Sequence, residues 1–299
     1  MTPPAPVPEV LGAGSPLTRA FFTEPSRPGL VLARFPTALY LSVGEHHEVL
    51  PVLASDALML PTGTRLSAPG RDVVWGVGPG DTVTVGRSGI RLPHWQIRVV
   101  REWRPAQIHA VSTLPAPWLL SETAELLSCQ AGSPELVDQA AAVCRAARCG
   151  DDVTLRGGVR LLLGAGPGLT PSGDDILCAV LLVLVGVGDP APIALLGRAV
   201  QDRWTATTSL SASLLDAARG GFAVPEVAAL VRCSLRGDLV GSRDALTATL
   251  AVGHWSGTDL VAGVIGCLHA LADASPRVRL PSLAFRPERR LQTAERESP

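Results

Sequence analysis

The amino-acid sequence predicts an α+β fold in which a β-rich part precedes a mainly helical part. Short runs of β-branched and apolar residues, separated by Pro and Gly turns, continue to about residue 105. Beyond that point, Ala- and Leu-rich segments follow the period of an amphipathic helix. We therefore expect a β-rich domain at residues 1–110, a helical domain that carries the functional loops at 111–276, and a tail at 277–299.

The N-terminal part begins with a Pro-rich stretch, residues 1–29, for which no regular structure is predicted. Later runs are typical of strands, because β-branched and aromatic residues favour a pleated, half-buried surface. The predicted strands are "LVLARF" (30–35), "ALYLSV" (38–43), "DVVWGV" (72–77), "DTVTVG" (81–86) and "WQIRVV" (95–100).

The C-terminal part contains segments whose apolar residues recur at helical spacing and whose ends are marked by Gly or Pro. The predicted helices cover residues 119–131, 134–148, 173–186, 191–203, 209–219, 225–235, 241–252 and 258–273. The final residues, "RPERRLQTAERESP", contain few apolar side chains, and this favours a loose tail outside the core.

Composition narrows the classes of function. The net charge of −1 gives no basic excess, so a nucleic-acid or anionic-membrane partner is not indicated. The 26 basic residues are all Arg, which excludes a lysine Schiff base and a phosphate-binding P-loop lysine. The most apolar run, 176–188, is shorter than the roughly 20 residues of a membrane span, and the N-terminus lacks the features of a signal peptide. We expect a cytoplasmic protein.

The six cysteines form no C-x-x-C pair, so we expect buried, reduced thiols.

The stretch "GAGPGLTPSGDD" (164–175) concentrates Gly, Pro, hydroxyl and acidic residues between two apolar runs. A glycine-rich turn that leads into a helix exposes backbone N–H groups, so it could hold a phosphate or a carboxylate. It could equally be a tight connection capped by Ser172. The anion-binding candidates in this stretch are Gly166, Gly168, Thr170, Ser172 and Gly173.

The pattern Ser-Gly-x-Asp at 172–175 recurs at 256–259, and each copy precedes apolar residues. In each copy Ser can cap a helix, and the Asp three residues later completes a capping-box-like start. A third start, at 205–221, opens with hydroxyl residues that could bind a ligand or cap their own helix. These starts add Thr207, Thr208, Ser209, Ser256, Gly257 and Asp259 to the binding candidates. We expect the loops 164–175, 205–211 and 253–259 to converge on one cleft.

The catalytic candidates are Asp174, Asp175 and His254. One Asp could cap while the other acts as a general base, the pair could hold a divalent cation such as Mg²⁺, or both could simply favour the helix dipole. Successive helical residues point about 100° apart, so we expect one inward and one capping carboxylate. His254 shares its loop with Ser256 and Asp259, which makes it the best-placed histidine.

Three motifs in this order, "GAGPGLTPSGDD", "TTSLSASLLDAARGG" and "GHWSGTD", resemble the AllH-like subunit family of oxamate carbamoyltransferase over roughly residues 110–275. The resemblance implies one subunit of a carbamoyltransferase of anaerobic allantoin and purine breakdown, which interconverts oxamate plus carbamoyl phosphate with oxalurate plus phosphate. It also implies a small anionic substrate and a hetero-oligomer with the other subunits. Arg160 or Arg203 could pair with a substrate carboxylate.

Two other functions remain open. The chain could be a non-catalytic partner whose loops complete another subunit's site. It could also be a stand-alone metal-dependent hydrolase that uses Asp174, Asp175 and His254.

Overall fold

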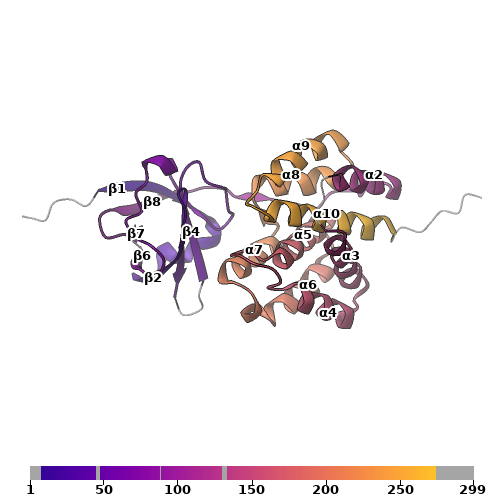
Figure 1. The fold of residues 1–299 in the computed structure, drawn as a ribbon, viewed down its shortest axis with the longest axis horizontal. Coiled ribbons are helices and arrows are strands. Elements are labelled where there is room, and N and C mark those ends of the chain that lie inside the picture. Colours follow the sequence, from indigo (N-terminus) through magenta and orange to yellow (C-terminus); the bar gives the residue numbers. More distant parts are fainter. Residues whose placement is uncertain (1–7, 45–47, 88, 130–132, 274–299) are drawn as a thin grey trace, which may run out of the picture.

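The computed structural model describes residues 8–44, 48–87, 89–129 and 133–273. It contains a barrel of strands and, beside it, a bundle of helices, so the predicted α+β class is confirmed (Figure 1). The predicted tail at 277–299 lies outside the described residues.

Eight strands close into a barrel in the order β1-β5-β4-β3-β2-β6-β7-β8. Most neighbours are antiparallel, whereas β1–β8 and β4–β5 are parallel. Leu39, Leu41, Leu50 and Ile97 are among the large side chains that are fully buried inside it. The strands are β1 (Glu9–Gly14), β2 (Arg27–Arg34), β3 (Ala38–Val43), β4 (Glu48–Leu53), β5 (Thr64–Leu66), β6 (Thr82–Gly86), β7 (Gly89–Arg91) and β8 (Gln96–Glu102).

The barrel departs from the sequence prediction at five places, two of which are the short strands β5 and β7, for which no strand was predicted. β1 lies within the stretch 1–29, which was predicted to be irregular. The run 72–77 forms no strand; its Trp75 is buried in the barrel core and donates to the carbonyl oxygen of Phe35 at 3.0 Å, so the run fills the barrel instead of extending the sheet. β4 was not predicted because Pro51 interrupts its pattern. Only Val52 and Leu53 of β4 pair with β5, so Pro51 has a paired strand on one side only.

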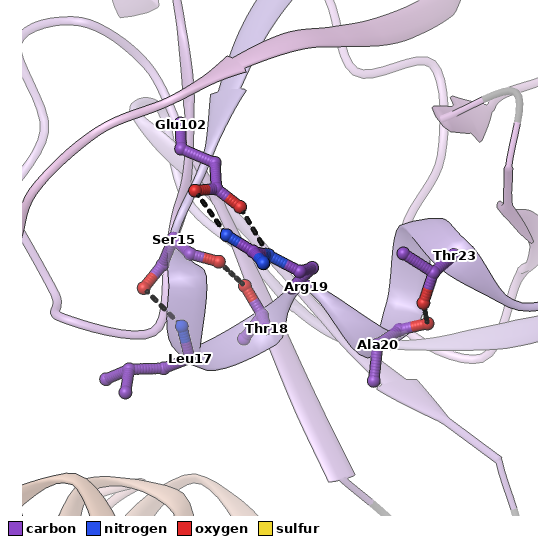
Figure 2. Close-up of polar contacts among 7 residues, drawn as sticks. All are labelled: Ser15, Leu17, Thr18, Arg19, Ala20, Thr23 and Glu102. Carbon is purple, nitrogen blue, oxygen red and sulfur yellow. Dashed lines mark hydrogen bonds and ion pairs between the residues drawn. The ribbon is translucent and has the colours of Figure 1, made fainter.

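Figure 2 shows how the chain turns after β1. The 3-10 helix η1 (Pro16–Thr18) is capped by Ser15, whose side chain accepts from the backbone of Leu17 at 3.2 Å. Helix α1 (Ala20–Thr23) follows directly. Arg19, between them, donates two hydrogen bonds of 2.6 and 2.7 Å to Glu102 at the end of β8 (Figure 2). This exposed bidentate pair ties the turn to the end of the parallel β1–β8 ladder.

The helical part is built around α5 and α10, which pack against each other and are buried along most of their length. A two-stranded sheet of β9 (Ala106–Gln107) and β10 (Phe222–Ala223) joins the segment after the barrel to the bundle. The helices are α2 (Pro117–Ser128), α3 (Pro134–Cys149), α4 (Asp152–Leu162), α5 (Ser172–Val187), α6 (Pro190–Gln201), α7 (Ser209–Arg219), α8 (Pro225–Ser234), α9 (Leu239–Leu250) and α10 (Ser256–Asp273).

Helix α4 was not predicted, because its consecutive glycines, Gly157 and Gly158, lower helix propensity. The structure gives a packing reason for one of them. A Cβ on Gly158 would lie 2.7 Å from Cγ2 of Val143, so glycine lets α4 approach α3 closely. The apolar run 176–188 lies in α5 within the core up to Val187, and Gly188 is the C-cap of this helix. No helix among the described residues is long and apolar enough to cross a membrane.

All six cysteines are free thiols. The expectation that they are buried is confirmed for Cys144, Cys178 and Cys267, whereas Cys233 is half-buried and Cys129 and Cys149 are exposed near helix ends.

Candidate functional site

Helices α5 and α10 begin side by side and direct their amino ends toward the barrel (Figure 1). Thr170 Oγ1, in the loop before α5, lies 3.0 Å from Ser256 Oγ at the start of α10. Each helix follows a glycine-containing loop, and both loops line one cleft. The two copies of the Ser-Gly-x-Asp pattern therefore meet in space.

The serines and acids of the two copies contact each other across the helix pair. Ser256 makes a polar contact with Asp175 that lowers the pKa of this carboxyl, and Ser172 does the same for Asp259. The predicted capping role of Ser172 is wrong: Pro171 occupies the N-cap position of α5, and Ser172 is the first helical residue. Its hydroxyl contacts the neighbouring helix because α10 begins so close by.

The glycines of the two copies hold the helix starts against the preceding helices. A Cβ on Gly173 would collide with the carbonyl oxygen of Leu162, and a Cβ on Gly257 would collide with that of Thr249. The backbone N–H of Gly173 donates to Ala165 O at 2.9 Å, and the backbone N–H of Gly257 donates to Val252 O at 2.9 Å. The pattern is thus a repeated packing device, and neither glycine lines the cleft.

One of the two carboxylates was expected to cap the helix. Asp174 does not cap α5; its side chain connects the glycine-rich loop to the segment before α7. Its side chain is 1% exposed. Oδ1 accepts from the backbone N–H of Gly164 at 2.8 Å, and Oδ2 accepts from the hydroxyl of Thr207. Both oxygens of this carboxylate are therefore engaged in holding the glycine-rich loop to the segment before α7.

Thr208 adds a second connection between the same two segments. It is the N-cap of α7, where its hydroxyl oxygen accepts from the backbone N–H of Ser211 at 3.1 Å. The same hydroxyl donates to Leu169 O at 2.6 Å. The expectation that one of these hydroxyls caps its own helix is confirmed, and all three predicted loops meet at one place.

Asp175 is the buried acid of the cleft. It is 6% exposed and lines the cavity, and its Oδ2 has no hydrogen-bond partner among the described residues. Burial, opposed by the contact with Ser256 and reinforced by Asp259 and Asp174, raises the pKa of Asp175 to about 8. This side chain is therefore mostly a neutral acid at pH 7 and can donate a hydrogen bond. Burial also raises the pKa of Asp259, which does not line the cavity.

The cleft has a volume of about 600 Å³ and lies between the barrel and the helices. The barrel contributes a mostly apolar wall that includes Phe35, Ala38, Tyr40, Leu58, Leu60 and Pro61. The helical side contributes a polar end, which we define as Gly168, Thr170, Ser172, Asp175, His254 and Ser256. His254 is exposed, and its ring meets the Trp255 ring edge-on at a centroid distance of 5.0 Å.

Several predicted site residues lie near the cleft without lining it: Gly166, Gly173, Asp174, Thr207, Thr208, Ser209, Gly257 and Asp259. Arg160 and Arg203 are exposed and do not line it either, and among the described residues no Arg does. Pairing of either Arg side chain with a substrate carboxylate therefore stays a prediction, without support from the lining of this cleft. The barrel wall was not predicted, because no local sequence pattern shows which strand residues face a second domain.

The cleft offers few ligand atoms for a divalent cation. Both oxygens of Asp174 already accept hydrogen bonds, and no group of three or more His, Cys, Asp or Glu side chains suited to a metal occurs within the part of the chain that the structure describes.

Comparison with known families adds one finding. Residues 162–268 match the model of a family described as oxamate carbamoyltransferase subunit AllH. The matched segment contains all three loops and does not include the barrel. Comparison with curated proteins and with solved structures gives no significant match.

Proposed function

We propose that this chain is one subunit of a cytoplasmic assembly of allantoin and purine breakdown that transfers a carbamoyl group between carbamoyl phosphate and an amide of the oxamate type, and that the cleft holds the amide. One observation carries the proposal. The segment that matches the carbamoyltransferase subunit family is the segment that builds the polar end of the cleft.

The reaction sets clear chemical requirements. The amide nitrogen attacks the carbonyl carbon of carbamoyl phosphate, so a C–N bond forms, the C–O bond to phosphate breaks, phosphate leaves, and the nitrogen loses a proton. A site for this step needs hydrogen-bond donors for the developing oxyanion and a group that accepts the proton.

The polar end offers both kinds of group. Thr170 and Ser256 place hydroxyl groups beside two helix amino ends, where negative charge is favoured, and either atom can be the donor in their mutual contact, so Thr170 can donate to a ligand when it accepts from Ser256. Asp175, with a pKa of about 8, can accept the proton in its ionised form and return it in the reverse reaction. We assign it the role of general acid and base.

The phosphate group fits this cleft poorly. No described Arg lines the cavity, and a dianion in a mostly apolar cleft without a cation loses much of its hydration energy. We therefore assign phosphate binding to another subunit, in keeping with an assembly of several chains. The stand-alone hydrolase is the weaker alternative, because Asp174 has no free oxygen to offer a metal.

The test is phosphate release from carbamoyl phosphate by the assembly that purifies with the tagged full-length chain, with and without oxamate. We expect release that depends on oxamate, and a loss of roughly a hundredfold or more in Asp175→Asn. Leu30→Gln changes an exposed residue of β2 outside the cleft and should not alter the rate. Oxamate-independent, metal-dependent hydrolysis by the isolated chain would support the hydrolase. A full rate in Asp175→Asn would support a non-catalytic partner.

A further inference from the structure

The barrel side of the cleft exposes large apolar side chains to the cavity. Phe35 is 44% exposed and Leu58 is 38% exposed, and both line the cleft. The Phe35 ring also contacts the Tyr40 ring, with centroids 5.6 Å apart. Single exposed apolar residues are ordinary on a protein surface, but these share one cavity with a buried acid.

The cavity is also large for oxamate, the substrate that the family description names. A water molecule accounts for about 30 Å³ of liquid, so oxamate, a molecule of six non-hydrogen atoms, fills at most roughly 180 Å³. The cleft offers about 600 Å³. Oxamate would leave the apolar wall in contact with water, so the wall contributes nothing to binding it.

The polar end has an unused hydrogen-bonding group. Asp175 Oδ2 is buried without a partner and belongs to a side chain that lines the cavity. A buried polar atom without a partner carries a cost that a bound ligand can remove. The unpartnered Oδ2 can accept from the N–H of a primary amide or, when it carries the proton, donate to the amide oxygen.

We propose that the cleft binds a primary amide that carries an aliphatic or aromatic body, with the amide head at Asp175 and the body against Phe35, Tyr40 and Leu58. This inference rests on the proposed function and names the class of its acceptor. The head reaches Thr170 and Ser256 at the same end, so the reacting nitrogen lies beside the acid while the body occupies the barrel side of the cavity.

The experiment is a ligand-observed NMR titration of the full-length chain with acetamide, butanamide, hexanamide and oxamate. Each methylene that becomes buried should tighten binding by about threefold to fourfold. Hexanamide should therefore bind far more tightly than acetamide or oxamate. Equal affinities along the series would overturn the proposal, and so would absence of binding by every amide.

Three variants locate the effect. Leu58→Gln and Phe35→Gln place a polar group on the apolar wall and should reduce the gain per methylene, with little change for acetamide. Leu30→Gln alters the same residue type at 46% exposure on the same barrel, outside the cleft, and should leave the series unchanged. If the gain in affinity per methylene stayed the same in both Leu58→Gln and Phe35→Gln, the apolar body of the amide would not lie against this wall, and the proposal would be contradicted.

Hexanoate tests the head group. A carboxylate cannot donate to Asp175, and its charge lies close to Asp259 and Asp174, so we expect it to bind more weakly than hexanamide. Tighter binding of hexanoate would overturn the amide assignment.

The two proposals fail in different ways. Chain-length-dependent amide binding without carbamoyl transfer would keep this inference and remove the proposed function. Carbamoyl transfer to oxamate, with equal affinities for acetamide, butanamide and hexanamide, would keep the proposed function and remove this inference.

Discussion

Thr170 Oγ1 and Ser256 Oγ lie 3.0 Å apart, although 86 residues separate them in the chain. This contact joins the loop before α5 to the first residue of α10, and the bonds of Asp174 and Thr208 hold the same loop to the start of α7. The polar end of the cleft is therefore a connected network. Such a network positions groups before a ligand arrives.

A double-mutant cycle should detect the contact between the loops. Thr170→Val and Ser256→Ala each remove one hydroxyl, so their effects on the free energy of unfolding should be non-additive by about 0.5–1.5 kcal/mol. Urea denaturation measures the four species. Thr23→Val, on α1 of the barrel, serves as a distant partner that should combine additively with Ser256→Ala. Additive behaviour of the first pair would mean that the contact contributes nothing.

The two adjacent acids should respond differently to amidation. Asp174→Asn replaces an accepting oxygen by an NH₂ group, so one of its two bonds is lost at a buried site, and we expect a loss of about 1.5–3 kcal/mol in stability. Asp175→Asn replaces a mostly neutral acid by a neutral amide and removes the destabilisation that the raised pKa causes at pH 7, so we expect no loss of stability. Urea denaturation of both variants at pH 7 measures the difference. Equal losses would argue that both acids have the same structural role.

Stability should depend on pH through Asp175. Its pKa is about 8 in the folded state and roughly 3.9 when unfolded. Between these values the folded state holds a proton that the unfolded state does not, so the free energy of unfolding falls as pH rises, by at most about 1.4 kcal/mol per pH unit. Asp175→Asn removes this contribution, and its stability relative to wild type should therefore increase from pH 4 to pH 8.

The neighbours of Asp175 define the control for this experiment. Asp259, whose pKa is also raised, contributes a slope of the same sign that remains in the variant, and Asp174 and His254 are present in both proteins. Parallel stability curves for wild type and Asp175→Asn would contradict the assignment of a buried, protonated acid.

The repeated glycines should tolerate no side chain. Ala at Gly173 or Gly257 would drive a methyl group into the carbonyl oxygens of Leu162 or Thr249, and we expect a loss of about 3 kcal/mol or more. Gly157→Ala, in α4, adds a methyl group in open space and should stabilise the protein by about 0.5–1 kcal/mol. Thermal denaturation compares the three. Similar melting temperatures for all of them would refute the packing role.

The sequence predicted the features that depend on local chemistry. The bounds of α7 follow from its capping hydroxyls and the glycines after it, and the recurrence of Ser-Gly-x-Asp correctly indicated two related helix starts. The partners of these residues could not be predicted in the same way. Ser172 contacts Asp259 instead of capping α5, because a second helix begins beside it.

Features that depend on packing between elements could not be predicted from the sequence. Gly157 and Gly158 predict no helix, yet α4 forms because its close approach to α3 buries apolar side chains such as Leu155 and Val159. No local sequence pattern predicts the apolar wall around Phe35 either, because its place in the cleft depends on which domain faces the barrel.

Hydrogen–deuterium exchange of the full-length chain with and without saturating hexanamide tests most directly the claim that the polar end of the cleft is the ligand site. The account predicts slower exchange of backbone amides in the loops 164–171 and 251–255 and at the barrel wall around Phe35, with no change in α3 and α4. Protection confined to other elements, or no protection at hexanamide concentrations that saturate binding, would contradict it.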